Sequence, residues 1–428
     1  MQFIVPGATR KRNKYDPRHF RILADHFCGI EWLDSLESIV PGNWTMVVRS
    51  PGYHGLGRSL ASRSGMDCAF DLISAEELEL LKRQGGRILV DLGWEMLSSA
   101  RSVVVSVAET LADLGIDPAS VYIFHGNQSA RAEFTRHWLE AVGTQPPYSV
   151  EYPVAMALCV VHHQKNFDPA DIAERRNQAM ARTLEGSRTR LFTSFNGEVR
   201  PHRLYLGAAF EHSGLIDRGY FSLVYPRKGA KETEEQFRER SLGLFRKMRR
   251  GPEYADAATR ILDKLPMELD IAAVPSGGIE EIAWISQDPR FYDDSRFSVV
   301  IDSIVSDSSS LFVTEKVLKP IMNHHPFLLV GSREGANLLR GYGFKTFEPY
   351  LRQCESGTFE DVLDNAIEEV ARLSTLDGDE LDKFSRALRP VCDYNAAHFW
   401  NEFPSILKHK LAECLLALGP SLPSTQPA

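Results

Sequence analysis

The chain has few cysteines and no cysteine-based motif. Its 428 residues include only 6 cysteines, which lie far apart, with no CxxC pair and no Cys/His pairing at the spacing of a zinc site. This pattern is typical of a protein from a reducing compartment that has no structural metal. We therefore expect a cytoplasmic location, with neither a disulfide framework nor a zinc centre.

Long hydrophobic runs and an excess of positive charge are also missing. The longest apolar stretch, residues 153–161, is about half of what a bilayer crossing needs. The N-terminal residues have too short a hydrophobic region for a secretory signal. Lys and Arg together number 49 against 57 Asp and Glu, a net charge of −8, which disfavours nucleic acid as a partner. We expect no transmembrane segment.

Common catalytic and metal-binding motifs are absent as well. The sequence contains no GxxxxGK[ST], GxSxG, HExxH or GxGxxG. Residues 377–379 spell DxD, but they open an acidic amphipathic helix instead of ending a strand. The adjacent pairs His162-His163 and His324-His325 face apart, which suits chelation of one ion poorly. The sequence therefore predicts no metal site.

What is present is an alternation of strands and helices. Runs rich in Val, Ile and aromatics predict strands at 44–50, 87–94, 120–127, 148–155, 190–197, 220–226, 297–305 and 326–331. Helical patterns fall at 75–83 (capped by Ser74), 102–114, 202–213, 314–323, 334–341, 358–387 and 394–418. Such alternation predicts the α/β class with mainly parallel, helix-covered sheets.

We expect two α/β domains. The predicted boundaries are 1–187 for the first domain, 188–393 for the second with a helical insertion at 227–265, 394–418 for a helix packing back on the first domain, and 419–428 for a disordered Pro/Ser-rich tail.

The most informative segment is 297–347, where a strand and a polar loop precede Thr314-Glu315-Lys316. If Thr314 caps a helix, the free backbone N–H groups and Lys316 favour an anion such as a diphosphate. Glu315 would face another direction and accept hydrogen bonds from ribose hydroxyls. Alternatively, Thr314-Glu315 is only a favourable helix start, and Lys316 is solvated.

Two arginines mark a second candidate. Arg200 and Arg203 lie where the strand ending at Asn196 turns into a helix, and guanidinium groups there suit a pyrophosphate. Asn196 could cap that helix or touch the ligand. The alternative is a surface stretch that pairs with acids elsewhere. Arg333, in another strand-to-helix loop, is a weaker phosphate candidate.

These motifs resemble those of known glycosyltransferases. The TEK box, with its helix and the following strand PFLLVG, resembles the donor-binding motif of fucosyltransferase-like enzymes. It resembles more closely a bacterial and phage glycosyltransferase group with TEKxxKP and a later GFKTF, here Lys319-Pro320 and residues 343–347. Residues 195–223 and, less specifically, 87–127 also match that group. Fucosyltransferases have Glu-Asn-Ser ahead of the TEK box, whereas the nearest acid here is Asp302, which leaves the sugar open.

The resemblance implies two Rossmann-like domains facing across a cleft, the GT-B architecture. The second domain would bind a nucleotide-diphosphate-sugar, a co-substrate that needs no further cofactor, through the residues Asn196, Arg200, Arg203, Asp302, Thr314, Glu315, Lys316 and Arg333. The first domain would bind the acceptor.

Catalysis would need a carboxylate that deprotonates the acceptor hydroxyl. Glu95 follows a predicted strand, and burial beside Trp94 would raise its pKa toward neutrality. An acid that merely opens a helix is the alternative, and Asp91 is the second choice. His54 and His125 are acceptor-side candidates, or else satisfied or solvated histidines.

The sequence thus predicts an inverting, metal-independent hexosyl- or fucosyltransferase-like enzyme. Its acceptor would be a glycan, a small molecule or a peptide. Two alternatives stay open: a catalytically silent nucleotide-sugar-binding or scaffold protein of the same fold, and a DNA-base-modifying glycosyltransferase.

Overall fold

A computed structural model describes most of the chain. The described residues are 2–6, 18–30, 32–33, 35–49, 69–92, 101–166, 170, 173–174, 177, 188–225, 233–269, 288–302, 311, 313–332, 334–354 and 357–419. The chain divides into two compact units. Unit 1 comprises Met1–His162, Ser309–Phe312 and Pro404–Ala428, and unit 2 comprises His163–Ser308 and Val313–Phe403.

Unit 1 contains a parallel sheet of six strands in the order β2-β1-β3-β4-β5-β6. The strands are β1 (Gln2–Ile4), β2 (Trp32–Leu33), β3 (Trp44–Arg49), β4 (Arg87–Asp91), β5 (Val121–His125) and β6 (Tyr148–Glu151). Every residue of β4 and β5 is buried, as expected for central strands covered on both faces.

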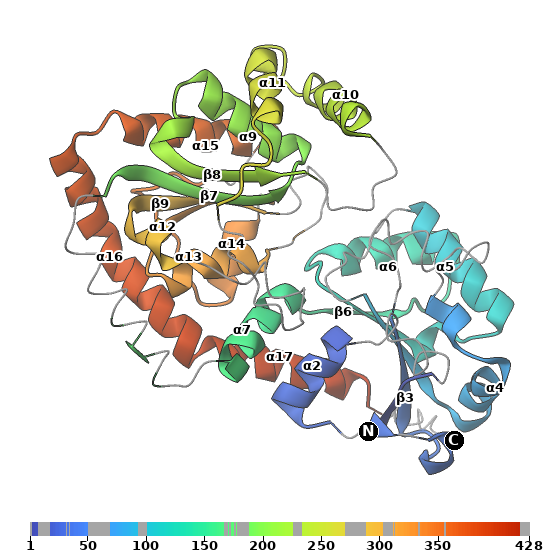
Figure 1. The fold of residues 1–428 in the computed structure, drawn as a ribbon. Helices are drawn as coiled ribbons and strands as arrows, with labels where there is room; N and C mark the ends of the chain where they lie inside the picture. Colours follow the sequence, from blue (N-terminus) through green and yellow to red (C-terminus); the bar gives the residue numbers. More distant parts are fainter. Residues whose placement is uncertain are drawn as a thin grey trace. The chain divides into compact units, whose positions relative to one another are not determined.

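Helices cover both faces of this sheet (Figure 1). On one face lie α4 (Ala75–Gln84), α5 (Arg101–Leu114) and α6 (Ala130–Ala141). The other face carries α2 (Arg18–Cys28), α7 (Val154–Asn166) and α17 (Phe403–Ala417). Trp44, Phe134 and Trp138 fill the core.

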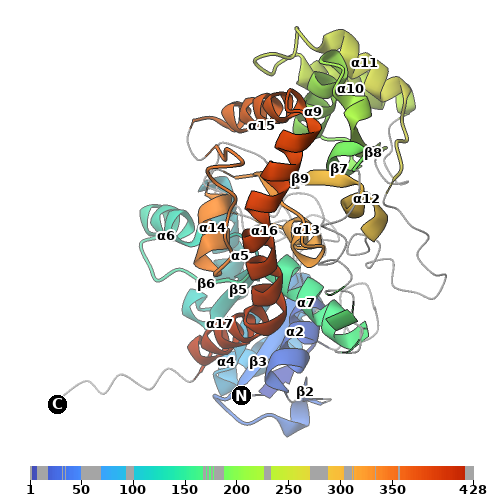
Figure 2. The same cartoon turned by 90° about the vertical axis from the view of Figure 1, so that its left-hand side faces the viewer.

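Unit 2 contains a parallel sheet of four strands in the order β10-β9-β7-β8. The strands are β7 (Arg190–Glu198), β8 (Gly219–Val224), β9 (Ser295–Ile301) and β10 (Phe327–Val330). Its helices are α9 (Pro201–His212), α10 (Glu234–Phe245), α11 (Ala255–Asp263), α12 (Pro289–Asp293), α13 (Leu318–Met322), α14 (Gly335–Gly341), α15 (Phe359–Ser374) and α16 (Gly378–Asn401). α9 and α15 cover one face of the sheet (Figure 1), and the long α16 packs against α13 (Figure 2).

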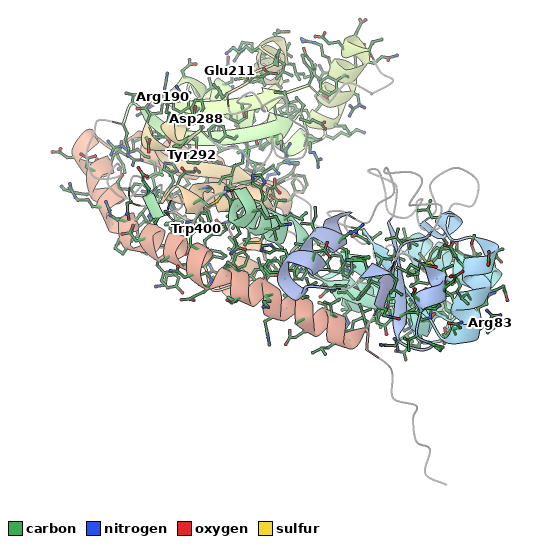
Figure 3. All side chains as sticks on the ribbon, turned by 60° about the horizontal axis from the view of Figure 1, so that its bottom comes forward. Arg83, Arg190, Glu211, Asp288, Tyr292 and Trp400 are labelled. Atoms are coloured by element: carbon green, nitrogen blue, oxygen red, sulfur yellow. The ribbon has the colours of Figure 1, made fainter. Side chains whose placement is uncertain are left out.

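The amino ends of β7 and β8 are held by structural contacts to Asp294. The backbone N–H of Arg190 donates to the carbonyl of Asp294 at 3.0 Å, and the Tyr220 hydroxyl donates to the Asp294 carboxylate at 2.7 Å. Arg190, Asp288 and Tyr292 are labelled in Figure 3. A ligand site on this sheet is therefore to be sought at the opposite, carboxyl ends.

The predicted α/β class with two parallel, helix-covered sheets is confirmed. The eight predicted strands are all present, with ends shifted by a few residues. β1 and β2 were not predicted, because strands of 3 and 2 residues are too short to show a period.

Three predicted helices have other limits. The helix expected at 314–323 begins as a short 3₁₀ turn, η6 (Glu315–Val317), before α13. The helices expected at 358–387 and 394–418 are instead α15, α16 and α17. Asp377 starts α16 with a capping box, in which its carboxylate accepts from the Glu380 N–H at 2.8 Å, and the helix continues through Pro390. The role predicted for Asp377 at a helix start is confirmed.

Candidate functional site

The strand order of unit 2 creates a switch point between β7 and β9. After β7 the chain passes through α9 to β8 on one side, whereas after β9 it passes through η6 and α13 to β10 on the other side. In open α/β sheets, ligands bind beyond the carboxyl ends of the strands at such a point. Of the predicted donor residues of unit 2 that the structure describes, Asn196 lies near the carboxyl end of β7, and the others follow β7 or β9.

At the end of β7, Asn196 is buried and held in one orientation. Its side-chain N–H₂ donates to the carbonyl and the hydroxyl of Ser194, both at 3.2 Å, and its backbone exchanges hydrogen bonds with the Ser222 hydroxyl. Within the described part of the chain, the side-chain oxygen of Asn196 is buried without a hydrogen-bond partner. Asn196 does not cap α9, because Arg200 occupies the N-cap position. An acceptor is thus left for a group from outside.

The first turn of α9 has no side-chain cap. Arg200 at the N-cap has extended backbone angles and makes no side-chain capping hydrogen bond, and Pro201 occupies the first helical position. Such a start leaves N–H groups and the positive end of the helix dipole available to an anion. The sequence prediction of a helix start at this place is confirmed.

Arg203, in the same turn, is 3% exposed. Its Nη1 donates to the carbonyl of Glu198 at 2.9 Å, while its Nε is buried and has no partner in the described ranges. Burial, assisted by the charge of Arg200, lowers the pKa of Arg203 to about 10, so the guanidinium stays charged at neutral pH. Asp302 and Glu315 act on it electrostatically, yet neither carboxylate forms an ion pair with it.

His202 joins α9 to the end of β9. Its Nε2 donates to the carbonyl of Asp302 at 3.2 Å. Burial and the neighbouring arginines lower the pKa of His202 to about 3, so the ring is neutral at physiological pH. His202 thus connects the start of α9, which follows β7, to the end of β9 by a hydrogen bond.

Asp302 is fully buried where β9 ends. Its Oδ1 accepts hydrogen bonds from the backbone N–H of Thr314 at 3.1 Å and from the Thr314 hydroxyl at 2.5 Å. Burial raises its pKa to about 6, against the lowering effects of Thr314 and Lys316. Thr314 in turn caps η6, since its hydroxyl accepts from the Lys316 N–H at 3.4 Å.

Glu315 and Lys316 contact each other, so the expectation that they face different directions is wrong. Lys316 Nζ lies 2.8 Å from Glu315 Oε1, and Glu315 is 4% exposed. A 3₁₀ turn starts here in place of an α-helix, and the long lysine stem reaches back to its neighbour. Lys316 therefore lies next to the switch point as half of an ion pair.

The GFKTF segment, residues 343–347, holds α16. The side chain of Asn395 accepts from the Lys345 N–H at 2.7 Å and donates to the Lys345 carbonyl at 2.8 Å. Lys345 Nζ lies 3.9 Å from the ring centre of Tyr394, and the Tyr394 hydroxyl donates to the Gly343 carbonyl at 3.1 Å. The contacts of this segment are structural.

In unit 1 the predicted acceptor-side residue His125 is completely buried at the end of β5. Its Nε2 lies 2.6 Å from the Ser149 hydroxyl, and burial lowers its pKa to about 3. Ser149 thus satisfies one ring nitrogen of His125, while Nδ1 is buried without a hydrogen-bond partner among the described residues. Asp91 is also buried, and its carboxylate accepts from the Phe20 N–H at 3.3 Å. Glu95, His54 and Arg333 lie outside the described residues.

An open surface hollow of about 430 Å³ lies near the carboxyl ends of β5 and β6. It is lined by Gln128, Ser129, Arg131, Ala132, Thr135 and Glu151. The Arg131 guanidinium stacks over the ring of Tyr148 at 4.7 Å, and the Arg131 N–H donates to Glu151 at 3.0 Å. This hollow is a second candidate site, on the unit in which the sequence predicts acceptor binding.

Within the described ranges, no group of three or more His, Cys, Asp or Glu side chains could hold a metal ion. A helix long and apolar enough to cross a membrane is likewise missing from this part of the chain.

Comparisons with known proteins give only distant similarities. No family model matches the chain, and no curated protein does. A chain of the GtfA/B complex is similar at 11% identity and a TM-score of 0.39, over 89% of this chain and 58% of that one. The N-terminal domain of Candida albicans trehalose-6-phosphate phosphatase is similar at 10% identity and a TM-score of 0.39, over 97% of this chain and 98% of that one. A glycosyltransferase from Rickettsia africae is similar at 11% identity and a TM-score of 0.36, over 96% of this chain and 98% of that one.

The chain spans 58% of the length of the GtfA/B chain. At this level of similarity nothing about function is carried over from these proteins. The functional assignment therefore rests on the residues at the switch point.

Proposed function

We propose that this protein is a glycosyltransferase that moves a sugar from a nucleotide-diphosphate-sugar to an acceptor hydroxyl, and that unit 2 binds the donor. The observation that carries the proposal is Arg203. Its guanidinium is 3% exposed, and its Nε has no hydrogen-bond partner among the described residues. The carboxylates of Asp302, Glu315 and Glu198 act on it electrostatically, but none of them forms an ion pair with it, so an anion in direct contact would stabilise the buried charge. Its position at the switch point makes a bound ligand the natural source of that anion.

A diphosphate fits the surroundings of Arg203. Arg200 lies at the N-cap of the same helix, whose first amides lack a side-chain cap, and the helix dipole adds partial positive charge. Guanidinium groups hold phosphate oxygens bidentately. When the bond to the sugar breaks, the same groups stabilise the charge that develops on the leaving diphosphate.

A nucleotide-sugar fits the site because the site offers hydrogen-bond acceptors as well as cations. The Asn196 side-chain oxygen is buried without a partner among the described residues, and the diphosphate of a nucleotide-sugar, which is fully ionised at neutral pH, has no proton to donate to it. Hydroxyl and N–H groups of a nucleoside or sugar do. The Glu315 carboxylate, paired with Lys316, adds a further acceptor beside a cation.

In the sugar transfer, the proton, the bonds formed and broken, and the leaving electron pair are all accounted for without a metal ion. A carboxylate, for which the sequence favours Glu95, takes the proton of the acceptor hydroxyl. The acceptor oxygen then forms its bond to the anomeric carbon from the face opposite the diphosphate. The bond from that carbon to the phosphate oxygen breaks, and the electron pair stays on the diphosphate beside Arg203. This route inverts the anomeric centre.

A thermal-shift screen of the full chain against nucleotide-sugars tests the proposal. A ligand at about 100 times its Kd adds roughly 2.7 kcal/mol to the free energy of unfolding. The Arg203→Ala variant should lose the shift, whereas Arg246→Ala, which removes an exposed arginine at the end of α10, should keep it. If no nucleotide-sugar or nucleoside diphosphate shifts the wild type at millimolar concentration, the proposal is wrong.

The site is equally compatible with a protein that binds a nucleotide-sugar without transferring it. Slow hydrolysis of the bound donor, abolished by Arg203→Ala, would identify an enzyme. Tight donor binding with no hydrolysis and no transfer to any hydroxyl acceptor would identify a silent binding protein.

A further inference from the structure

The two carboxylate oxygens of Asp302 have different surroundings. Oδ1 is saturated, because both the N–H and the hydroxyl of Thr314 donate to it. Oδ2 is buried and has no hydrogen-bond partner among the described residues. The carboxylate is 0% exposed, so bulk water does not satisfy this oxygen.

Gly331 at the end of β10 provides the space for Oδ2. A Cβ atom at this position would lie 2.6 Å from Asp302 Oδ2, closer than such atoms approach one another. The carboxylate is also anchored along the chain, since the Asp302 N–H donates to the Val330 carbonyl at 2.9 Å. The next residue, Ser332, has a buried hydroxyl without a partner as well. Two neighbouring strand ends thus present unsatisfied oxygens together.

The charges around Asp302 come from two elements. Lys316 and Glu315 act on it from η6, and Arg203 from α9, while the neutral His202 occupies its carbonyl. With a pKa of about 6, the carboxyl group is mainly ionised at pH 7 and is then an acceptor only. A phosphate oxygen cannot pair with such a group, because both are acceptors.

We propose that Asp302 contacts the bound nucleotide-sugar directly, its Oδ1 holding Thr314 at the start of η6 while its Oδ2 accepts a hydrogen bond from a hydroxyl or N–H group of the ligand. This inference rests on the proposed donor site in unit 2. It assigns Asp302 to the uncharged, donor-bearing part of the ligand, and Arg203 to the diphosphate.

Asp302 and Arg203 are assigned to different parts of the ligand for a chemical reason. Hydrogen bonds to a charged acceptor contribute more than those between neutral groups, and a buried unpaired acceptor rejects a ligand that lacks the matching donor. Asp302 therefore discriminates between ligands that differ by a single hydroxyl or amino group, whereas Arg203 binds any diphosphate.

The test is a double-mutant comparison between protein and ligand, made by calorimetry on the full chain. The probes are UDP, GDP, ADP and CDP, their 2′-deoxy and 3′-deoxy forms, and the glucose conjugates of the four ribonucleotides. For the tightest ligand, Asp302→Asn should weaken binding at least tenfold. Asp256→Asn, at an exposed position on α11, is the matched control and should change affinity less than twofold.

The comparison of ligands identifies which group of the ligand donates the hydrogen bond to Asp302 Oδ2. A ligand that lacks the hydroxyl or N–H group bonded to Oδ2 should bind the wild type at least tenfold more weakly. The same change in the ligand should weaken binding to Asp302→Asn less than threefold. If a deoxy nucleotide shows this behaviour, the hydrogen-bond donor lies on the ribose. If a change of base shows it, the hydrogen-bond donor lies on the base, and if removal of glucose shows it, the hydrogen-bond donor lies on the sugar. If Asp302→Asn does not fold, Gly331→Ala, which displaces Oδ2, should give the same pattern.

Two results would overturn the inference, and they differ. If nucleoside diphosphates bind and every ligand loses the same factor in the wild type and in Asp302→Asn, the contact with Oδ2 is wrong while the donor site stands. If neither the nucleoside diphosphates nor their glucose conjugates bind the wild type, the proposed function falls, and the role of Asp302 falls with it.

Discussion

Arg203 Nη1 lies 2.9 Å from the carbonyl oxygen of Glu198, so the first turn of α9 is tied to the last residue of β7. This bond orients the guanidinium and leaves its Nε without a partner. The geometry is that of a preorganised cation, which needs no rearrangement before it meets an anion.

Arg203→Ala should therefore weaken donor binding by at least tenfold, because a charge-assisted hydrogen bond contributes about 1.5–3 kcal/mol. Arg203→Lys should recover only part of this, since an ammonium group cannot bond Glu198 and a phosphate in the same fork. Calorimetric titration with a nucleoside diphosphate measures both. Equal affinity in wild type and Arg203→Ala would remove Arg203 from the site.

The second prediction concerns the ion pair of Glu315 and Lys316. Lys316→Ala should lower donor affinity at least tenfold, since it removes a cation and leaves the buried Glu315 carboxylate without this partner. Glu315→Gln in the same background should restore part of the loss by removing the unpaired charge. If Lys316→Ala leaves nucleotide affinity unchanged, the assignment of the TEK box to the donor is wrong.

A third prediction concerns metals. Transfer activity should persist in excess EDTA, because Arg200, Arg203 and Lys316 supply the positive charge that a divalent ion would otherwise bring to the diphosphate. The check is a transfer assay with and without chelator at constant ionic strength. Complete loss on chelation, with recovery on adding Mn²⁺ or Mg²⁺, would contradict the mechanism.

The fourth prediction tests the general base. Glu95→Gln keeps the size of the side chain but cannot accept a proton, so kcat should fall by roughly 10²–10⁴. Donor affinity should change less than twofold, because the donor residues belong to unit 2. A variant that retains more than about a tenth of wild-type turnover would exclude Glu95. The search would then move to Asp91, His54 and His125.

Much of the site could be predicted because its residues follow apolar strands. The runs ending before Asn196 and Asp302 are continuous enough to indicate buried parallel strands, and polar residues after such strands are candidates on general grounds. Thr314 as a cap was predictable from its preference for that position, and the structure confirms it.

What could not be predicted depends on pairing between distant segments. No local pattern indicates that β7 lies beside β9, and only this order brings His202 to the carbonyl of Asp302. The contact of Glu315 with Lys316 depends on a 3₁₀ turn in place of an α-turn, a small difference in backbone angles. Gly331 and Ser332 belong to a predicted strand-to-helix loop, but no local pattern indicates that Gly331 lies against the Asp302 carboxylate, because that carboxylate belongs to the neighbouring strand end.

The last prediction separates fold from function in the GFKTF segment. Gly343 has φ = 91°, and a Cβ there would lie 2.6 Å from His398 Cε1 and 2.7 Å from its Nε2. That ring cannot move away easily, because its Nε2 donates to the Tyr342 carbonyl at 2.7 Å and its Nδ1 lies 2.9 Å from Glu402. Gly343→Ala should therefore lower the free energy of unfolding by about 1–3 kcal/mol from backbone strain, and further from the clash with His398.

Gly341→Ala, two residues earlier, is the matched control. It meets no atom within 4 Å and lies at the exposed end of α14, so it should be neutral or stabilising by up to about 1 kcal/mol. Urea denaturation of the two variants gives the comparison, and nucleotide affinity measured below the unfolding transition should equal that of the wild type in both. If Gly343→Ala is as stable as Gly341→Ala but binds nucleotide at least tenfold more weakly, the GFKTF segment belongs to the ligand site and its structural role is wrong.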